Sequence, residues 1–122
     1  MLVALWIINA LLALVFLAAG SMKLFRPKSA LHSAGMTWTE EFSDAGIKLI
    51  AAAEIAGAVG LILPLLTGIV PILTPMAASA LALLMAGASV VHLRRKENPA
   101  PSVVLGILSL VSAVLGFVVV LS

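Results

Sequence analysis

Glu54 is the residue whose chemistry stands out most clearly in this chain. It is the one acidic side chain within a long apolar stretch, and counted from Ala45 it lies about 14 Å along a helix, near the middle of a bilayer. A charge at that depth costs about 2.5–3.5 kcal/mol on insertion scales. Such a carboxyl requires a cation, a water-filled cavity or a bound proton. We therefore expect Glu54 to have a functional or partner-pairing role.

Four further polar residues lie on helix faces that an antiparallel bundle turns toward Glu54. Lys23 and Asn9 share one face of the first apolar stretch, and His92 and Ser89 share one face of the third. We expect these residues to form one interior polar cluster with Glu54. Lys23 is expected roughly 10 Å from Glu54 along the bundle axis. The two would then be joined either directly through the long lysine stem or through a water bridge.

The same residues also have structural interpretations. Lys23, at the end of an apolar stretch, suits snorkelling toward lipid phosphates. His92, close to Arg94 and Arg95, suits the membrane interface. Asn9 suits an interhelical hydrogen bond, and Glu54 could simply neutralise Lys23 or a partner's cation.

The composition excludes a water-soluble globular domain. Of the 122 residues, 63% are hydrophobic and only 10% are charged, and the mean hydropathy is +1.27. Seven basic against five acidic residues give too little charge to predict a nucleic-acid surface. Without cysteine there is no disulfide, thiolate metal site or dithiol relay. Phosphate-binding, hydrolase and zinc-protease motifs are also missing, so catalysis by this chain alone is not expected.

Four uncharged or nearly uncharged runs are long enough to cross a bilayer of about 30 Å. Asp44 is expected to cap the second, Pro64 to end it, and Thr74-Pro75 to open the third. The expected spans are residues 2–22, 45–63, 75–93 and 101–121. The sequence thus predicts an all-α integral membrane four-helix bundle, with residues 1–122 forming a single membrane domain.

The basic residues orient these spans. Lys23, Arg26 and Lys28 lie between the first two spans, with Lys48 just inside the second, and Arg94, Arg95 and Lys96 lie between the last two. Residues 65–73, by contrast, carry no charge. The positive-inside rule places both basic loops in the cytoplasm. The N-terminus and the C-terminus are then both expected on the outer side.

The loop of residues 24–43 is expected to lie at the cytoplasmic interface. Pro27 suits the start of a short helix that stops at Gly35, and Thr37 with Glu40 has capping-box spacing. Trp38 is typical of the headgroup layer. This loop is predicted either to anchor the bundle or to act as a lid over a ligand.

Small residues mark the faces on which the helices are expected to pack. Ala53 with Gly57 and Ala56 with Gly60 have small-xxx-small spacing in the second span. A similar stripe follows the fourth span: Ser102, Gly106, Ser109, Ala113 and Gly116. These patterns indicate close helix packing and no chemistry.

The order of these motifs resembles the DoxX-like family of small bacterial four-helix membrane proteins. The matching blocks are Gly20 to Lys23 followed by a proline, Glu54 within a Gly/Ala-rich helix that ends at Pro64, the Thr74-Pro75 start, and His92 before the arginines. The resemblance covers nearly the whole chain and implies that Lys23, Glu54 and His92 occupy recurring polar positions. It also implies a bacterial cytoplasmic (inner) membrane location. Relatives include a membrane subunit of a thiosulfate:quinone oxidoreductase, partners of soluble redox enzymes and a receptor-assembly chaperone.

Three functional hypotheses follow. The first is a non-catalytic accessory or ligand-binding module of a membrane redox or assembly complex, with no intrinsic cofactor, that binds a quinone or lipid near Glu54. Hydrogen bonds from Lys23 or a protonated Glu54 to a carbonyl would orient that ligand. The chain would work as a homo-oligomer or with a partner membrane or redox subunit. The second is a small proton-coupled multidrug exporter that uses Glu54. The third is a structural or chaperone-like membrane protein.

Overall fold

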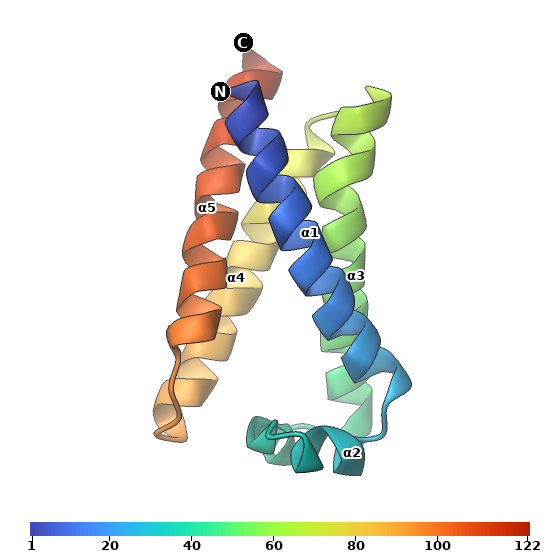
Figure 1. The fold of residues 1–122 in the computed structure, drawn as a ribbon, viewed down its shortest axis with the longest axis vertical. Coiled ribbons are helices and arrows are strands. Elements are labelled where there is room, and N and C mark those ends of the chain that lie inside the picture. The colour runs from blue at the N-terminus through green and yellow to red at the C-terminus, as the bar shows by residue number, and fades with distance from the viewer.

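A computed structural model describes residues 1–122, and every regular element in it is a helix. The order is α1 (Leu2–Phe25), α2 (Lys28–Ser33), the 3₁₀ helix η1 (Thr37–Glu41), α3 (Asp44–Thr67), α4 (Leu73–Arg94) and α5 (Ala100–Leu121) (Figure 1). The four helices α1, α3, α4 and α5 are each long and apolar enough to cross a membrane. The chain is therefore a multi-pass membrane protein with four apolar helices.

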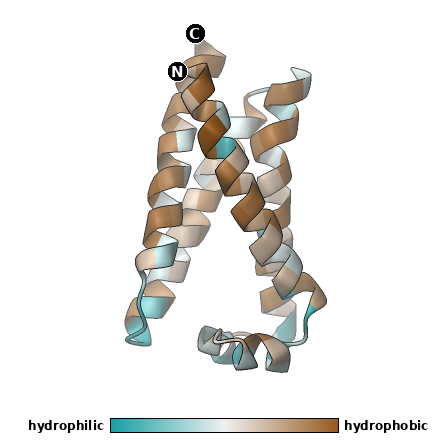
Figure 2. Cartoon of the chain, in the orientation of Figure 1, coloured by the Kyte–Doolittle hydropathy of each residue, from teal (hydrophilic) through white to brown (hydrophobic).

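The long helices form two pairs. α1 packs along α3, and α4 packs along α5, with α3 against α4 and α1 against α5 joining the pairs. The pairs approach each other near the two chain ends and diverge toward α2 and η1 (Figure 1). Apolar residues cover most of the four long helices, whereas hydrophilic residues gather at the end that holds η1 and the loop before α5 (Figure 2). Both termini thus lie at one end and both basic loops at the other.

Small residues let the helices approach closely, as the sequence pattern predicts. A Cβ at Gly57 would lie 2.6 Å from Leu81 Cδ2, and a Cβ at Gly60 would lie 2.7 Å from Ala77 Cβ. The buried apolar core lies around these contacts and includes Phe16 of α1. Side chains of α4 thus lie directly against the α3 backbone at both glycines, which brings the two helices close together.

Two helix ends differ from their expected positions. Ser43, and not Asp44, caps α3, because the Ser43 hydroxyl accepts a hydrogen bond from the Gly46 amide at 3.1 Å. α3 also continues past Pro64 to Thr67 and ends at Gly68, whose φ of +74° is the left-handed conformation common after helices.

The passage of α3 through Pro64 depends on the neighbouring helices. Proline has no amide hydrogen, so the carbonyl of Gly60 loses its helical donor. The Thr74 hydroxyl donates to that carbonyl at 2.9 Å and accepts from the Leu65 amide at 3.2 Å. The Asn9 side-chain amide donates to the adjacent carbonyl, that of Leu61, at 3.0 Å. Thr74 therefore does not cap α4, which begins at Leu73, because its hydroxyl forms hydrogen bonds with the backbone of α3 around Pro64.

The segment between α1 and α3 forms the two short helices that the sequence predicts. Pro27 precedes α2, and Gly35, with φ +99°, follows its end. The expected capping box at η1 does not form, because Thr37 and Glu40 both bond to other elements. Lys48 of α3 ties the segment to α1 by donating to the carbonyls of Lys23 and Arg26.

Candidate functional site

Lys23 and Glu54 form a direct ion pair between α1 and α3. The Lys23 Nζ to Glu54 Oε1 distance is 2.5 Å, and Glu54 is only 1% exposed. Gly20 makes the approach possible, because a Cβ there would lie 3.2 Å from Glu54 Cβ and 3.0 Å from the carbonyl oxygen of Ala51. The lysine stem thus reaches down to the carboxylate, and of the two expected linkages the direct one is present.

The ion pair lines a cavity of about 550 Å³ between the two helix pairs, at the end where they diverge. α4 and α5 supply an apolar wall that includes Leu84, Met85 and Leu105. Residues around η1 close the end of the cavity: Met36, Trp38 and Phe42. The polar lining residues are Lys23, Glu54, His92 and Ser102. An apolar chamber of this size with a few convergent polar groups is typical of small-molecule sites.

Trp38 lies beside the ion pair. The Lys23 ammonium is 5.4 Å from the centroid of the Trp38 ring, and Phe42 packs edge-on against the same ring at 5.7 Å. The lysine charge is therefore held by the Glu54 carboxylate and by an aromatic face. The position of Trp38 among charged residues indicated the headgroup layer, and nothing in the sequence connected it with Lys23.

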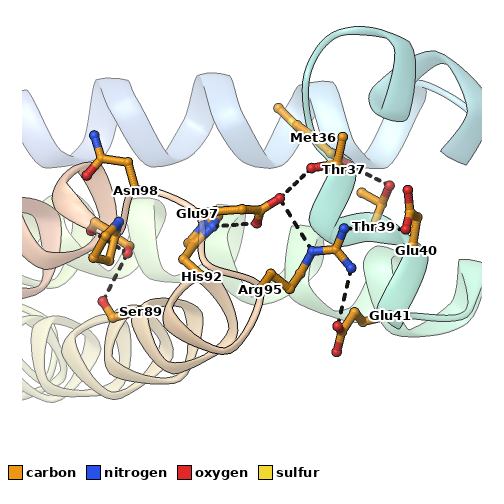
Figure 3. Close-up of polar contacts among 12 residues, drawn as sticks. Met36, Thr37, Thr39, Glu40, Glu41, Ser89, His92, Arg95, Glu97 and Asn98 are labelled. Carbon is orange, nitrogen blue, oxygen red and sulfur yellow. Dashed lines mark hydrogen bonds and ion pairs between the residues drawn. The ribbon is translucent and has the colours of Figure 1, made fainter.

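His92 enters the cavity wall from α4. Its Nδ1 lies 3.1 Å from Glu97 Oε1, and Glu97 also accepts a hydrogen bond from the Thr37 hydroxyl (Figure 3). No sequence pattern indicated Glu97, because it follows the end of α4 and only the turn of the chain after Arg95 brings it back to His92.

Arg95 joins η1 to the end of α4. It forms ion pairs with Glu40 at 3.3 Å, Glu41 at 3.2 Å and Glu97 at 3.4 Å (Figure 3). We call Thr37, Glu40, Glu41, Arg95 and Glu97 the latch, because they hold the η1 end of the cavity against the α4–α5 loop. Hydrogen bonds from Thr37 and His92, together with the Arg95 guanidinium at 3.4 Å, hold the pKa of Glu97 below its ordinary value. Hydrogen bonds from His32 and Arg95 do the same for the pKa of Glu40.

Two of the expected cluster residues lie outside this cavity. Asn9 is fully buried beside Leu61, and its Oδ1 accepts from the Ser112 hydroxyl of α5. Ser89 donates within α4 and meets the Ser102 hydroxyl at 2.9 Å on the far side of the cavity wall. The structure therefore brings Lys23, Glu54 and His92 together and places Asn9 and Ser89 in helix-packing contacts. Nowhere do three His, Asp or Glu side chains gather closely enough to hold a metal ion.

Comparison with known protein families adds an identification to this geometry. Residues 7–118 match the DoxX-like family. The chain belongs to the DoxX-like family. The match extends over the four long helices of this DoxX-like protein, so Lys23, Glu54 and His92 all fall within the family region. No curated protein and no solved structure matches the chain.

Proposed function

We propose that this DoxX-like protein is a non-catalytic module that binds a neutral amphipathic molecule, of the quinone or lipid type, in the cavity beside Glu54. The observation that carries the proposal is the Lys23–Glu54 pair on the wall of an otherwise apolar chamber. The two charges cancel, so the site favours a head group with no net charge. The apolar wall of α4 and α5 suits the hydrocarbon part of such a molecule.

The ion pair leaves hydrogen-bonding capacity for a ligand. An ammonium group has three donors, and Lys23 uses one of them on Glu54. The remaining donors, with His92 and Ser102 on the facing wall, would fix the orientation of a head group that enters between the helix pairs. An ion pair that only neutralised Glu54 would need no cavity beside it.

We further propose that the module serves a membrane redox or assembly complex in the bacterial cytoplasmic membrane, either as a homo-oligomer or beside a partner subunit. Both basic loops lie at the η1 end, which supports a cytoplasmic position for that end under the positive-inside rule. Any electron transfer or assembly step would then be supplied by the partner. We do not propose cation export, because Lys23 already holds the cation position at Glu54.

Filling the cavity tests the proposal most directly. Gly87 lines the cavity, and a Cβ placed there meets no atom within 4 Å, so Gly87→Phe can start into the cavity without a backbone clash. The neighbouring Ala86 lines a separate groove between α4 and α5 and not this cavity, so Ala86→Phe controls for added bulk outside the proposed site. We expect native mass spectrometry to show a small amphiphile on the wild type and on Ala86→Phe that is lost from Gly87→Phe.

Glu54→Gln provides the second arm of this experiment. The amide keeps the shape of the side chain but removes the charge that holds Lys23, so we expect the bound amphiphile to be lost or strongly reduced. If all four proteins carry the same lipids, or none, the binding proposal is wrong. Glu54 is then a pairing residue, and a co-purifying subunit becomes the next object of search.

A further inference from the structure

The two acceptor groups on the cavity wall have unused hydrogen-bonding positions. Glu54 accepts from Lys23 through Oε1, and its Oε2 makes no hydrogen bond although the residue is 1% exposed. His92 meets Glu97 through Nδ1, and its Nε2 makes no hydrogen bond. Both residues line the cavity, so both free atoms are available to a molecule that binds there.

The contacts of Glu97 determine whether the Nδ1 atom of His92 donates or accepts a hydrogen bond. The Glu97 carboxylate accepts from the Thr37 hydroxyl and lies 3.4 Å from Arg95 Nε, an arrangement that favours its ionised, acceptor-only form. His92 must therefore donate from Nδ1. With the ring in its neutral form, which is the form this proposal assigns to His92, the other nitrogen is an acceptor and Nε2 presents a lone pair.

The cavity wall thus presents two acceptors without a partner, Glu54 Oε2 and His92 Nε2, and one free donor group, the Lys23 ammonium, since the Ser102 hydroxyl already donates to the Pro99 carbonyl. We infer that the site selects a head group that brings hydroxyl donors to Glu54 and His92 and an oxygen acceptor to Lys23. This inference rests on the proposed function and narrows its ligand class to hydroxyl-bearing neutral amphiphiles. An alkylated hydroquinone and a monoacylglycerol share this chemistry, because each combines two hydroxyl groups with oxygen lone pairs.

The inference separates ligands of almost equal size. A quinone has the same ring as its hydroquinone, but its two oxygens only accept, so they would face the lone pairs of Glu54 and His92. A dimethyl ether of the hydroquinone likewise has no donor. A site built to accept hydrogen bonds rejects analogues that lack the donors, because the ligand displaces water from its acceptors and leaves them unpaired.

The test compares binding of decylhydroquinone, decylquinone and decylhydroquinone dimethyl ether to the full chain in detergent, by calorimetry under anaerobic conditions. A second series compares monoolein with its dimethyl ether. We expect a hydroxyl-bearing ligand to bind at least about 10-fold more tightly than its ether, and the hydroquinone at least about 10-fold more tightly than the quinone. Tighter binding of the hydroxyl form in the hydroquinone series alone identifies a redox-type head group. Tighter binding of the hydroxyl form in the monoolein series alone identifies a lipid. Equal binding of the hydroxyl and ether forms in both series overturns the inference.

Two His92 variants test the role of Nε2. His92→Asn places an amide near the Nδ1 position, where it can still donate to Glu97, but has no atom at Nε2. His92→Gln reaches the Nε2 position with an acceptor oxygen. We expect His92→Asn to weaken the hydroxyl-bearing ligand about 10-fold, with little effect on its ether, and His92→Gln to restore part of the loss. Equal affinities in wild type and His92→Asn contradict the inference.

Gly87→Phe separates the two levels of the proposal. If Gly87→Phe abolishes binding while all analogues bind the wild type equally, the cavity site stands and only the hydroxyl selection is wrong. If the analogues bind Gly87→Phe as well as they bind the wild type, the binding is elsewhere, and both the proposed function and this inference fail.

Discussion

At the scale of single residues, the Lys23–Glu54 pair explains how a carboxylate is kept in the middle of the apolar helix α3. The cation that offsets the cost of its burial comes from the neighbouring helix of the same chain, at 2.5 Å. Removing one partner of a buried pair leaves an uncompensated charge, whereas replacing both leaves none. Comparing a single with a double substitution therefore measures how much of the stability effect comes from an unpaired charge.

We predict that Lys23→Met destabilises the protein by on the order of 3 kcal/mol, because it strands the Glu54 charge. The double variant Lys23→Met with Glu54→Gln should recover at least half of that loss. Denaturation of the three proteins in mixed micelles measures both values. A double variant less stable than Lys23→Met would show that the pair acts as more than mutual neutralisation.

The sequence identified Glu54, Lys23 and His92 but not the groups that complete their surroundings. Glu54 was recognisable because insertion cost depends on residue type and depth alone. Its direct contact with Lys23 depends on how closely Gly20 lets α1 approach α3, which spacing along one helix does not specify. Trp38 and Glu97 belong to segments outside the spans, where no helical periodicity relates them to the cavity.

At the scale of secondary-structure elements, α3 crosses Pro64 because α4 supplies a hydroxyl. Thr74 compensates the Gly60 carbonyl that proline leaves without a donor. We predict that Thr74→Val costs about 1 kcal/mol in the wild-type background, the usual size of an interhelical hydrogen bond in a membrane. In a Pro64→Ala background the new amide can donate to Gly60 itself, so the same substitution should cost less than half as much.

A double-mutant cycle in mixed micelles measures this coupling. The control is Ser79→Ala, whose hydroxyl bonds only within α4 and whose cost should not depend on the residue at position 64. Equal costs of Thr74→Val in both backgrounds would rule out the repair of α3 by Thr74. The sequence could not predict this contact, because a Thr-Pro pair at a helix start is ordinarily a cap.

The latch should open in acid. The pKa of Glu97 in the folded protein lies below its ordinary value of 4.5, and the largest cause is the hydrogen bond from the Thr37 hydroxyl. The contacts of the ionised Glu97 therefore stabilise the fold fully above pH 4.5. This stabilisation is lost as the pH falls through the lowered pKa. Glu40 changes in the same direction. We predict an acid transition in Trp38 fluorescence with a midpoint below pH 4.5.

The measurement uses Trp6→Phe, which leaves Trp38 as the single tryptophan. Thr37→Val should move the midpoint upward toward pH 4.5, because it removes the largest cause of the lowered Glu97 pKa. Arg95→Gln should weaken the transition, since it removes three ion pairs of the latch. A midpoint unchanged by Thr37→Val would show that Trp38 reports another group.

At the scale of the whole molecule, the two ends of the bundle differ. The helix pairs meet at the end that holds both termini and diverge at the end that holds both basic loops (Figure 1). The number, order and approximate limits of the spans were predictable, because each needs about 20 apolar residues between polar groups. The divergence of the two helix pairs could not be predicted. It depends on close contacts of small residues near one end and on the larger residues around the cavity at the other.

We predict that the chain ends face away from the cytoplasm. Alkaline phosphatase fused after Ser122 should be active in a bacterial host, and a fluorescent protein fused there should be dark. The same reporters inserted after Lys96 should give the opposite result. Matching signals from both positions would contradict the topology of paired basic loops on one side.

The placement of Lys23 and Glu54 on the first two spans also bears on membrane insertion during synthesis. Both partners of the ion pair belong to α1 and α3, which pack along each other, so no residue of α4 or α5 takes part in the pair. We therefore expect the pair to form as soon as α1 and α3 have entered the membrane, before the second half of the chain packs. The cavity then closes around a charge pair already in place.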